Sequence, residues 1–536
     1  MQSDQQAEYA AQRRLIYALV ANLQNRPPAS GVRLLETHIS WILLFGRHAY
    51  KIKKAVNLGF LDFSSLQARR FYCEEEIRLN RRLAPKIYLD VIAIGGNPEN
   101  PVLGEYPAIE YAVRMRRFPR TKQLDKLATR NKLLPQHIDG LAASVAQFHL
   151  RLPVSEDNSP FGTPDAVYKD AAQNFEHLQA LLTDSKDLER LATLRRASDS
   201  EFEQCRSLFA QRRTQGFVRE CHGDLHLGNI VLIGEQPVPF DGIEFNPALR
   251  WIDVISEIAF TVMDLLYHRR TDFAWRFLNA YLEITGDYAG VKLLRFYVAY
   301  RAMVRAKVSA ITASQTELGT KEKAAAWNAC RDYMALAEQS LARKKSALIL
   351  THGLPGSGKS TFAQLALARL QAVRLRSDVE RKRLFGLDPL ADSRASTGMN
   401  LYASDISKRT YAHLYALANE LLTAGMTVIV DATFLKHEER EHFHQLAGRL
   451  GIPFVIASVQ SGDATLRARI TQRQRAENDA SEADIAVLEK LQKTQEILSP
   501  EESDYTAVFV NEASGIVESS EGWNRLKQLL DLQRQT

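Results

Sequence analysis

The chain contains 536 residues, of which 45% are hydrophobic and 25% charged, and its formal net charge is +6. This balance excludes a disordered chain, and the length predicts two large domains instead of one core. No apolar run approaches the ~20 residues that cross a bilayer, and the first residues lack a secretory signal pattern, so we expect a cytoplasmic protein without membrane contact. Four scattered cysteines without a CxxC pair favour a reducing compartment.

The N-terminal part begins with an apolar, β-rich stretch at residues 39–56, which predicts a hairpin. Helical spacing follows over residues 65–83 and stops before Pro85. Two further strands are expected at residues 87–94 and 111–118. Together these patterns predict a small β-rich lobe with one helix.

A lysine and a glutamate in this lobe are candidate nucleotide-binding residues. Lys51 ends the sequence Ala-Tyr-Lys in a predicted strand, and Glu76 lies on the following helix, as in the lysine–glutamate pair of kinases. Lys53 points to the same face as Lys51, because strand side chains alternate, so the assignment stays open between them. Glu75 and Glu74 compete with Glu76 in the same way.

Between the β-rich lobe and the next segment, chain order places Met115 at a hinge where an adenine ring would bind. From about Leu133 to Ala342 the pattern is mainly helical, interrupted by one β-rich insert at residues 221–245. This insert contains the residues with the clearest chemical pattern of the N-terminal half.

The insert begins with His-Gly-Asp-Leu-His-Leu-Gly-Asn, which fits H-x-D-x-x-x-x-N, where the Asp meets an acceptor hydroxyl and the Asn binds metal. These positions are Asp224 and Asn229. A hairpin centred near residues 234–237 would bring the chain back to Asp241, so that Asn229 and Asp241 could together hold Mg²⁺ on nucleotide phosphates. Asp224 is then the candidate catalytic base.

The sequences HGDLHLGN, FDGIEF and AYK resemble the aminoglycoside phosphotransferase family over most of residues 35–330. The resemblance implies a two-lobed protein-kinase-like fold and phosphorylation of a hydroxyl on antibiotics, choline, homoserine, sugars or similar compounds. Asp253 resembles the later Asp with which family members brace the catalytic loop, and a helix cap is the alternative. Gly223 replaces the Arg of protein kinases, which argues against protein substrates.

A new pattern opens near residue 345, which predicts domains at 1–345 and 346–536. Short apolar strands then alternate with helices, which predicts an α/β fold whose parallel sheet is covered on both faces. The strands are expected at residues 347–350, 428–430, 454–459 and 507–510, with a short one before Asp378.

Residues 353–360, Gly-Leu-Pro-Gly-Ser-Gly-Lys-Ser, fit the P-loop pattern G-x-x-x-x-G-K-[ST] between a strand and a helix. The glycines let backbone amides converge on phosphate oxygens, and the helix start adds the positive end of its dipole. Lys359 would contact the β and γ phosphates and Ser360 would ligate Mg²⁺. The predicted ATP-binding residues of this loop are Gly353, Gly356, Ser357, Gly358, Lys359, Ser360 and Thr361.

Two carboxylates follow strands of this half. Asp431 follows a predicted strand, at the carboxyl ends of the strands where ligands of such sheets bind. It is the candidate carboxylate on the Mg²⁺ side of the nucleotide. The alternative is that it only caps a helix or forms a turn at the strand end. Asp378 and Arg381 share one face of the next helix, where the Asp could accept the proton of an attacking hydroxyl and the Arg could hold a phosphate. A surface ion pair would have the same spacing.

Four arginines occur in residues 465–475, and Arg469 and Arg473 fall on one helical face. This segment has the chemistry of a lid over nucleotide phosphates, and a solvated basic face is the alternative. Residues 346–536 resemble the P-loop kinases of the zeta-toxin and polynucleotide-kinase group. The resemblance rests on GLPGSGKS, the Asp378–Arg381 pair, VIVDAT and this arginine-rich segment. The resemblance implies a kinase that acts on a hydroxyl with Asp378 as its base.

The favoured hypothesis is a tandem ATP- and Mg²⁺-dependent kinase whose acceptors are small-molecule or nucleotide-type hydroxyls. One alternative is a kinase of nucleic-acid 5′-hydroxyl ends, and another is that one domain only binds nucleotide as a sensor or scaffold. The sequence does not specify the acceptors or the oligomeric state.

Overall fold

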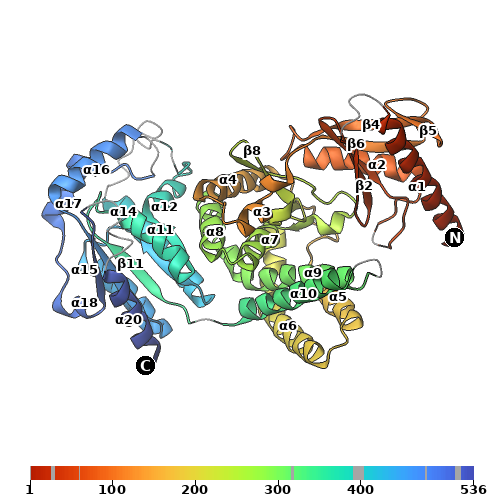
Figure 1. The fold of residues 1–536 in the computed structure, drawn as a ribbon. Coiled ribbons are helices and arrows are strands. Elements are labelled where there is room, and N and C mark those ends of the chain that lie inside the picture. Colours follow the sequence, from red (N-terminus) through yellow and green to blue (C-terminus); the bar gives the residue numbers. More distant parts are fainter. Residues whose placement is uncertain are drawn as a thin grey trace. The chain divides into compact units, whose positions relative to one another are not determined.

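The computed structural model describes residues 2–535 except 26–30, 60, 316–318, 344, 390, 392–403, 477–479 and 513–520. It contains two compact units that interleave along the chain (Figure 1). The first unit comprises residues 1–195, 202–264 and 301–330, and the second comprises residues 196–201, 265–300 and 331–536. Because neither unit is continuous in sequence, the predicted domain boundary near residue 345 stays a prediction.

The N-terminal lobe of the first unit is a six-stranded antiparallel sheet of order β1-β2-β3-β6-β4-β5. The predicted hairpin is confirmed as β2–β3, and β4 and β6 confirm the two further strands. Helix α2 (Leu66–Asn80) is the predicted helix. The strands are β1 (Arg33–Glu36), β2 (Ser40–Phe45), β3 (His48–Lys53), β4 (Tyr88–Asn97), β5 (Asn100–Leu103) and β6 (Glu110–Arg116).

Helix α1 (Gln2–Gln24) is an element that the sequence patterns did not indicate. Leu15, Leu19 and Leu23 recur every four residues, so their side chains lie along one face of the helix. They join a buried cluster with Trp41 and other side chains of the sheet. The helix therefore covers apolar surface of the N-terminal lobe.

The remainder of the first unit is mainly helical, as predicted; the β-rich insert contains the two-stranded sheet β8–β9, and the segments on either side of it form a second two-stranded sheet, β7–β10. Helices α6, α7, α9 and α10 each contain residues of both units. The helices are α3 (Leu124–Thr129), α4 (Pro135–Arg151), α5 (Pro164–Leu181), α6 (Ser185–Thr214), α7 (Val254–Tyr267), α9 (Leu294–Ala313) and α10 (Thr320–Leu341). The short strands are β7 (Val218–Glu220), β8 (Ile230–Ile233), β9 (Gln236–Pro239) and β10 (Trp251–Asp253).

The second unit is built on a five-stranded parallel sheet of order β12-β13-β11-β14-β15, which confirms the predicted α/β fold. The strands are β11 (Leu348–His352), β12 (Ala372–Arg376), β13 (Thr427–Asp431), β14 (Phe454–Gln460) and β15 (Thr506–Val510). The helices are α8 (Thr271–Thr285), α11 (Lys359–Leu370), α12 (Ser377–Arg383), α14 (Ser404–Thr423), α15 (His437–Leu450), α16 (Asp463–Ala476), α17 (Ile485–Thr494), α18 (Pro500–Asp504) and α20 (Gly522–Gln535).

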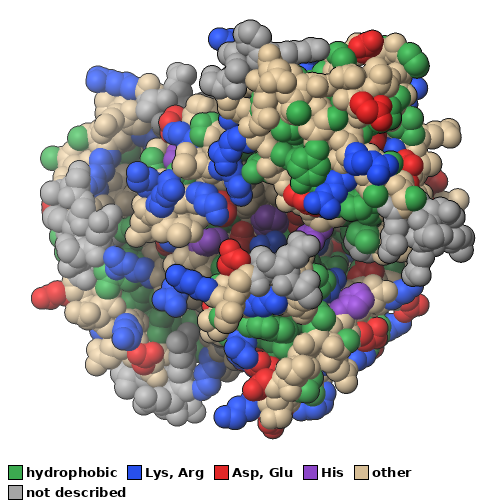
Figure 2. Space-filling view, turned by 45° about the vertical axis from the view of Figure 1, so that its right-hand side comes forward, with side chains coloured by type: hydrophobic (Ala, Val, Ile, Leu, Met, Phe, Trp, Pro, Cys, Tyr) green, Lys and Arg blue, Asp and Glu red, His purple; other side chains and the backbone are tan. Residues whose placement is uncertain are grey.

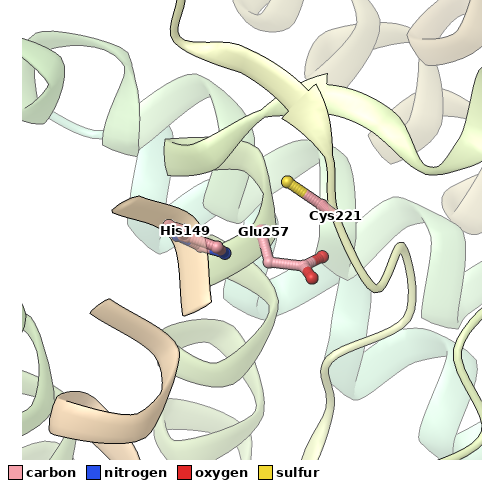
Figure 3. Close-up of side chains that lie close together, drawn as sticks. All are labelled: His149, Cys221 and Glu257. Carbon is pink, nitrogen blue, oxygen red and sulfur yellow. The ribbon is translucent and has the colours of Figure 1, made fainter. Parts of the chain in front are cut away.

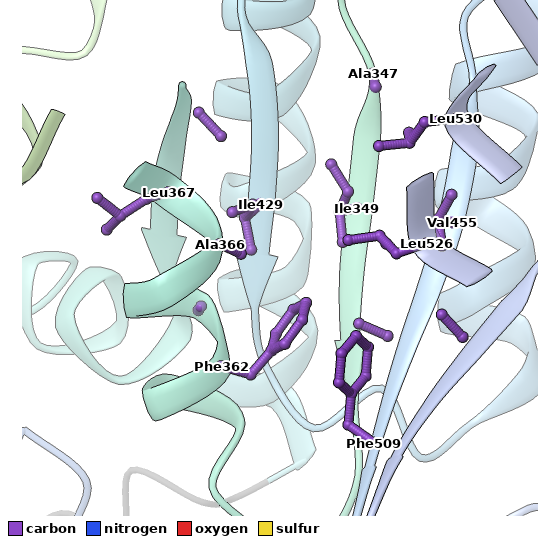
Figure 4. Close-up of a cluster of buried hydrophobic side chains, with 14 of the residues drawn as sticks. Ala347, Ile349, Phe362, Ala366, Leu367, Ile429, Val455, Phe509, Leu526 and Leu530 are labelled. Atoms are coloured by element: carbon purple, nitrogen blue, oxygen red, sulfur yellow. The ribbon is translucent and has the colours of Figure 1, made fainter. Parts of the chain in front are cut away.

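The core of this sheet fixes the start of helix α11. Figure 4 shows α11 and α20 in front of the strands and other helices behind them. Phe362, in the first turn of α11, packs against Phe509 with ring centroids 4.6 Å apart, and Leu526 of α20 joins the same buried cluster. Because α11 is anchored at this turn, the loop between β11 and α11 is held at the carboxyl end of the central strand.

Figure 2 shows one face of the molecule, on which the coloured Lys and Arg side chains are interspersed with acidic and apolar ones. None of the helices in the described part of the chain is both long and apolar enough to cross a bilayer.

Candidate functional sites

In the first unit, Lys51 and Lys53 both contact Glu76, because alternate residues of β3 face α2. Lys51 Nζ lies 2.9 Å from Glu76 Oε1 and 2.5 Å from Asp241 Oδ1. The fully buried Lys53 also pairs with Glu76, but its second partner is Glu244. Burial acts to lower the pKa of Lys51, but Asp241 and Glu76 raise it well above its ordinary value. The geometry therefore favours Lys51 as the site lysine, with Lys53 as its structural neighbour.

The neighbouring glutamates of α2 have other partners. Glu74 pairs with Arg70 at the surface, and Glu75 pairs with Arg78 and Arg250. Glu76 is therefore the glutamate that the two lysines share. Met115 lies on β6 next to Ala49 in the pairing with β3, in a buried cluster where the last strand of the lobe ends.

The predicted hairpin is confirmed as β8–β9, with Ile233 opposite Gln236 across the turn. Phe240 N donates to Asn229 O at 2.9 Å, so Asp241 follows directly beside Asn229. Asp241 has a φ of 67°, an unusual value for a residue other than glycine, and its amide donates to Tyr88 Oη at 2.9 Å. The hairpin thus brings two residues with metal-type oxygens to one end, although they are separated along the chain.

Asp224 lies beside Asn229, at the same end of the β8–β9 hairpin. Asn229 Nδ2 donates to Asp224 Oδ2 at 2.8 Å, and His226 Nε2 lies 3.5 Å from that oxygen. His226 Nδ1 accepts from Gly228 N, so in the neutral ring the proton is on the nitrogen that faces Asp224. Burial acts to raise the pKa of Asp224, but His226 and Arg305 lower it below its usual range. Asp224 is therefore ionised at neutral pH.

Helix α7 holds the backbone of the loop that carries Asp224. Glu257 accepts from the amides of His222 and Gly223, at 2.6 Å and 3.0 Å. Further along the same face, Thr261 Oγ1 donates to Leu225 O and Asp264 accepts from Leu227 N. These are polar residues at helical spacing in an otherwise apolar helix, which is the signal by which the sequence could have identified them.

Asp253, the residue expected to brace this loop, has other hydrogen bonds. It pairs with Arg212 through two bonds of 2.8 Å and 3.0 Å, and it accepts from Ile255 N at the start of α7. The helix-cap alternative is therefore the one that the geometry favours, and Glu257 contacts the loop.

Figure 3 shows Glu257 beside His149 and Cys221, with their ligand-type atoms within 4.8 Å of one another. Burial raises the pKa of the Cys221 thiol well above its ordinary value, with a further contribution from Glu257. Burial also lowers the pKa of His149 to about 3. A neutral thiol and a neutral imidazole therefore lie behind the loop, and the Glu257 carboxylate is engaged by the loop amides.

In the second unit, the P-loop connects β11 to α11, and its glycines at 353, 356 and 358 have φ values of 140°, 83° and 99°. A Cβ on Gly358 would lie 2.1 Å from Asn511 Nδ2, which donates to Ser357 O at 2.8 Å. Asn511 comes directly after β15 and was not predicted from the sequence. Its side chain fixes the loop backbone at a point where only glycine fits.

Lys359 is the first residue of α11, and its Nζ donates to Leu354 O at 2.8 Å. Burial lowers the pKa of Lys359 to about 8. Asp431, at the end of β13, is buried, and its Oδ2 accepts no hydrogen bond from the described residues. Burial raises the pKa of Asp431, and Arg374, Arg376, Lys359 and a hydrogen bond from Ser360 act in the opposite direction. A carboxylate oxygen without a donor beside a serine hydroxyl fits a Mg²⁺ site.

Asp378 and Arg381 form the predicted pair on α12, with Oδ1 and Nη1 2.7 Å apart. On α16, Arg469 donates to Gly356 O at 3.3 Å, and Arg473 donates to Ala483 O at 2.8 Å. Arg467 instead pairs with exposed acidic residues. A cavity of about 730 Å³ is lined by side chains from all of these elements, among them Lys359, Ser360, Thr361, Asp378, Arg381, Asp431, Arg469 and Arg473.

Comparisons with known proteins cover both parts of the chain. Residues 348–498 match a family model described as an AAA domain. A choline/ethanolamine kinase family protein from Mesorhizobium loti is 12% identical, covering 61% of this chain and 99% of that one, with a TM-score of 0.35. A gluconokinase from Sinorhizobium meliloti 1021 is 19% identical, covering 36% and 99%, with a TM-score of 0.28. At such identities and TM-scores, neither likeness identifies a substrate.

Two mycobacterial proteins match over most of their length. The uncharacterized protein Rv2004c of Mycobacterium tuberculosis is 31% identical over 458 residues, which cover 84% of this chain and 88% of the relative. The uncharacterized protein Mb2027c of Mycobacterium bovis gives the same values. The matched stretch is longer than either half of the sequence, so it includes residues of both. The chain therefore belongs to the same family as these two mycobacterial proteins.

Proposed function

We propose that the protein is a tandem ATP-dependent phosphotransferase, in which each unit transfers the γ-phosphoryl group to a hydroxyl acceptor. One observation carries the proposal: each unit gathers a lysine, a set of oxygens suited to Mg²⁺ and a separate carboxylate that can meet a hydroxyl. Mg²⁺ bound at these oxygens would offset the charge that develops on the phosphates during transfer.

In the first unit, Lys51 binds the nucleotide phosphates and Glu76 holds that lysine in place. Asn229 and Asp241 are the metal ligands. Asp224 orients the acceptor hydroxyl and takes its proton. The support is the contact of Lys51 with both Glu76 and Asp241, and the hydrogen bond from Asn229 to Asp224.

In the second unit, the P-loop amides and Lys359 bind the β and γ phosphates, and Ser360 and Asp431 hold Mg²⁺. Asp378 is the base, and Arg381, Arg469 and Arg473 bind phosphate oxygens or the transferring group. The support is that Asp378 lines the same cavity as Lys359 and Asp431. The zeta-toxin and polynucleotide-kinase resemblance, and with it the end-kinase alternative, stays a prediction.

The test is incubation of the full chain with γ-labelled ATP, Mg²⁺ and pools of metabolites or oligonucleotides. Asp224→Asn and Asp378→Asn preserve side-chain shape, and Asp165→Asn is the matched control because Asp165 is an exposed partner of Arg206. We expect Asp224→Asn and Asp378→Asn each to abolish a different labelled product, and Asp165→Asn to abolish none. Equal labelling in all variants would refute both assignments. Loss of one product with no second product in the wild type would favour the sensor alternative.

A further inference from the structure

The second unit contains a segment that comes before the P-loop in sequence by about seventy residues. Helix α8 lies against β12, the strand at one edge of the parallel sheet. Asn279 Nδ2 donates to Ala372 O at 3.0 Å, and Asn279 Oδ1 accepts from Arg374 N at 2.7 Å. The buried amide of Asn279 thus bonds to the outer backbone groups of β12 as a further strand would.

One turn further along α8, Glu283 contacts two arginines of β12. Arg374 Nε lies 3.0 Å and Arg376 Nη1 lies 3.4 Å from Glu283 oxygens. Burial acts to raise the pKa of Glu283, but the two arginines lower it below its ordinary value. Glu283 is therefore an ionised carboxylate that holds two guanidinium groups, one of which, Arg376, lines the cavity beside Asp378.

The residues after α8 contact helix α12, which carries Asp378. Tyr288 Oη donates to Glu380 Oε1 at 3.1 Å, and Arg383 Nη2 donates to Glu283 O at 2.6 Å. Glu380 is fully buried. The segment thus contacts both β12 and α12, and Asp378 lies in the first turn of α12.

We propose that Glu283 is a positioning residue for the second unit: by holding Arg376 at the end of β12, directly before α12, it fixes the place of Asp378 in the cavity. This inference depends on the proposed function of that unit. It means that the P-loop kinase is complete only with residues 265–300, which the sequence pattern assigns to the first half of the chain.

The charge of Glu283 gives this role a signature in pH. Burial acts to raise the pKa of Asp378, but the groups that face this carboxylate outweigh burial and lower its pKa. These groups are Arg381, Ser481, Arg376 and Arg473, and Lys359 also faces it. Replacing Glu283 by glutamine removes the negative charge that offsets Arg374 and Arg376. The positive potential at Asp378 then increases, and the acidic limb of the pH–rate profile moves to lower pH.

The test uses the full chain with Asp224→Asn as background, so that turnover reports the second unit. The probe is γ-labelled ATP, with water as acceptor and release of inorganic phosphate as the readout. We expect Glu283→Gln to lower kcat about tenfold or more, since small misplacements of reacting groups are costly, with MgATP affinity changed less than about twofold. The acidic limb of kcat should shift to lower pH.

The matched control is Glu420→Gln. Glu420 pairs with Lys292 at 2.9 Å, so it also joins residues 265–300 to the rest of the second unit, but it lies on α14, and its ion pair does not involve β12 or α12. Its kcat and pH profile should match the background. If Glu283→Gln does not fold, Tyr288→Phe tests a second contact of the same segment, the hydrogen bond to Glu380 of α12, with kcat lowered about threefold, as expected for one lost hydrogen bond.

The outcomes separate this inference from the proposed function. Equal turnover in the background and in Lys359→Ala would refute phosphotransfer by the second unit. Turnover that needs Lys359 but is the same in Glu283→Gln, in both kcat and pH profile, would overturn the positioning role alone. A lower kcat without a shift of the acidic limb would indicate a purely structural role for Glu283 and would also overturn it.

Discussion

Lys359 Nζ donates to the carbonyl oxygen of Leu354 at 2.8 Å, so the ammonium expected to meet phosphate is engaged by its own loop. Binding a nucleotide at this site requires the exchange of that bond for contacts with phosphate oxygens. The exchange is electrostatically favourable only while the amine is protonated, which gives the first prediction.

The affinity of the P-loop site for MgATP should fall at alkaline pH. The pKa of Lys359 is lowered to about 8 by burial, so the amine is protonated below that pH and loses its charge above it. Phosphate binding favours the charged form, so affinity should be flat up to about pH 7 and then fall by up to about tenfold per pH unit above pH 8. Titration of a fluorescent ATP analogue between pH 6.5 and 9.5 measures this. Lys359→Arg should remove the pH dependence, because arginine stays charged.

Gly358→Ala should weaken nucleotide binding at the P-loop. The residue has a φ of 99°, and an added Cβ would lie 2.1 Å from Asn511 Nδ2, which holds the loop backbone. Loss of at least tenfold in affinity is expected, measured by calorimetric titration with ATP. Gly448→Ala is the control: nothing lies within 4 Å of its Cβ position inside helix α15, so it should stabilise the fold by about 0.5–1 kcal/mol.

Glu76→Gln should destabilise the first unit strongly. The Glu76 carboxylate is buried and pairs with two lysines, so its neutralisation weakens two buried ion pairs, and each lysine keeps one other carboxylate partner. The loss of a hydrogen bond between charged groups costs about 1.5–3 kcal/mol for each bond. Urea unfolding should show this loss, whereas Glu74→Gln, which removes an exposed pair with Arg70, should change stability by less than about 1 kcal/mol. Equal effects of the two substitutions would contradict the assignment of Glu76.

Glu257→Gln and Asp253→Asn should separate support of the catalytic loop from support of the fold. Glu257 accepts from two loop amides, so its substitution should lower kcat of the first unit and cost about 1–3 kcal/mol of stability. Asp253 contacts Arg212 and the start of α7, so its substitution should lower stability while kcat stays within about twofold. Turnover assays beside thermal unfolding would show whether the two effects separate.

The first unit should keep its activity at mildly acidic pH. The pKa of Asp224 is below its usual range, because His226 and Arg305 outweigh burial, so the carboxylate remains ionised as pH falls from 8 to 5. A profile of the first unit's kcat, measured in the Lys359→Ala background, should show no acidic limb from Asp224 in that interval. Titration of the Asp224 carboxyl carbon within that interval, followed by NMR, would contradict this pKa.

Local sequence patterns were sufficient for the elements whose form depends on near neighbours. The P-loop, the strands of the second unit and the β8–β9 hairpin were predicted because strand alternation, turn residues and glycine conformation act within a few positions. The same alternation predicted that Lys51 and Lys53 share a face. It could not decide between them, since the decision lies in Asp241, which is 190 residues away.

The sequence by itself predicted which residues would carry the proposed phosphate-binding chemistry, because those motifs are short and their geometry is built into the backbone. Only the tertiary structure decided that Glu257 and not Asp253 contacts the catalytic loop, that Asn511 fixes the P-loop, and that α8 bonds to the edge of β12. Each of these contacts joins segments far apart in the chain. Such pairings depend on how whole helices and sheets pack against one another, which no local pattern specifies.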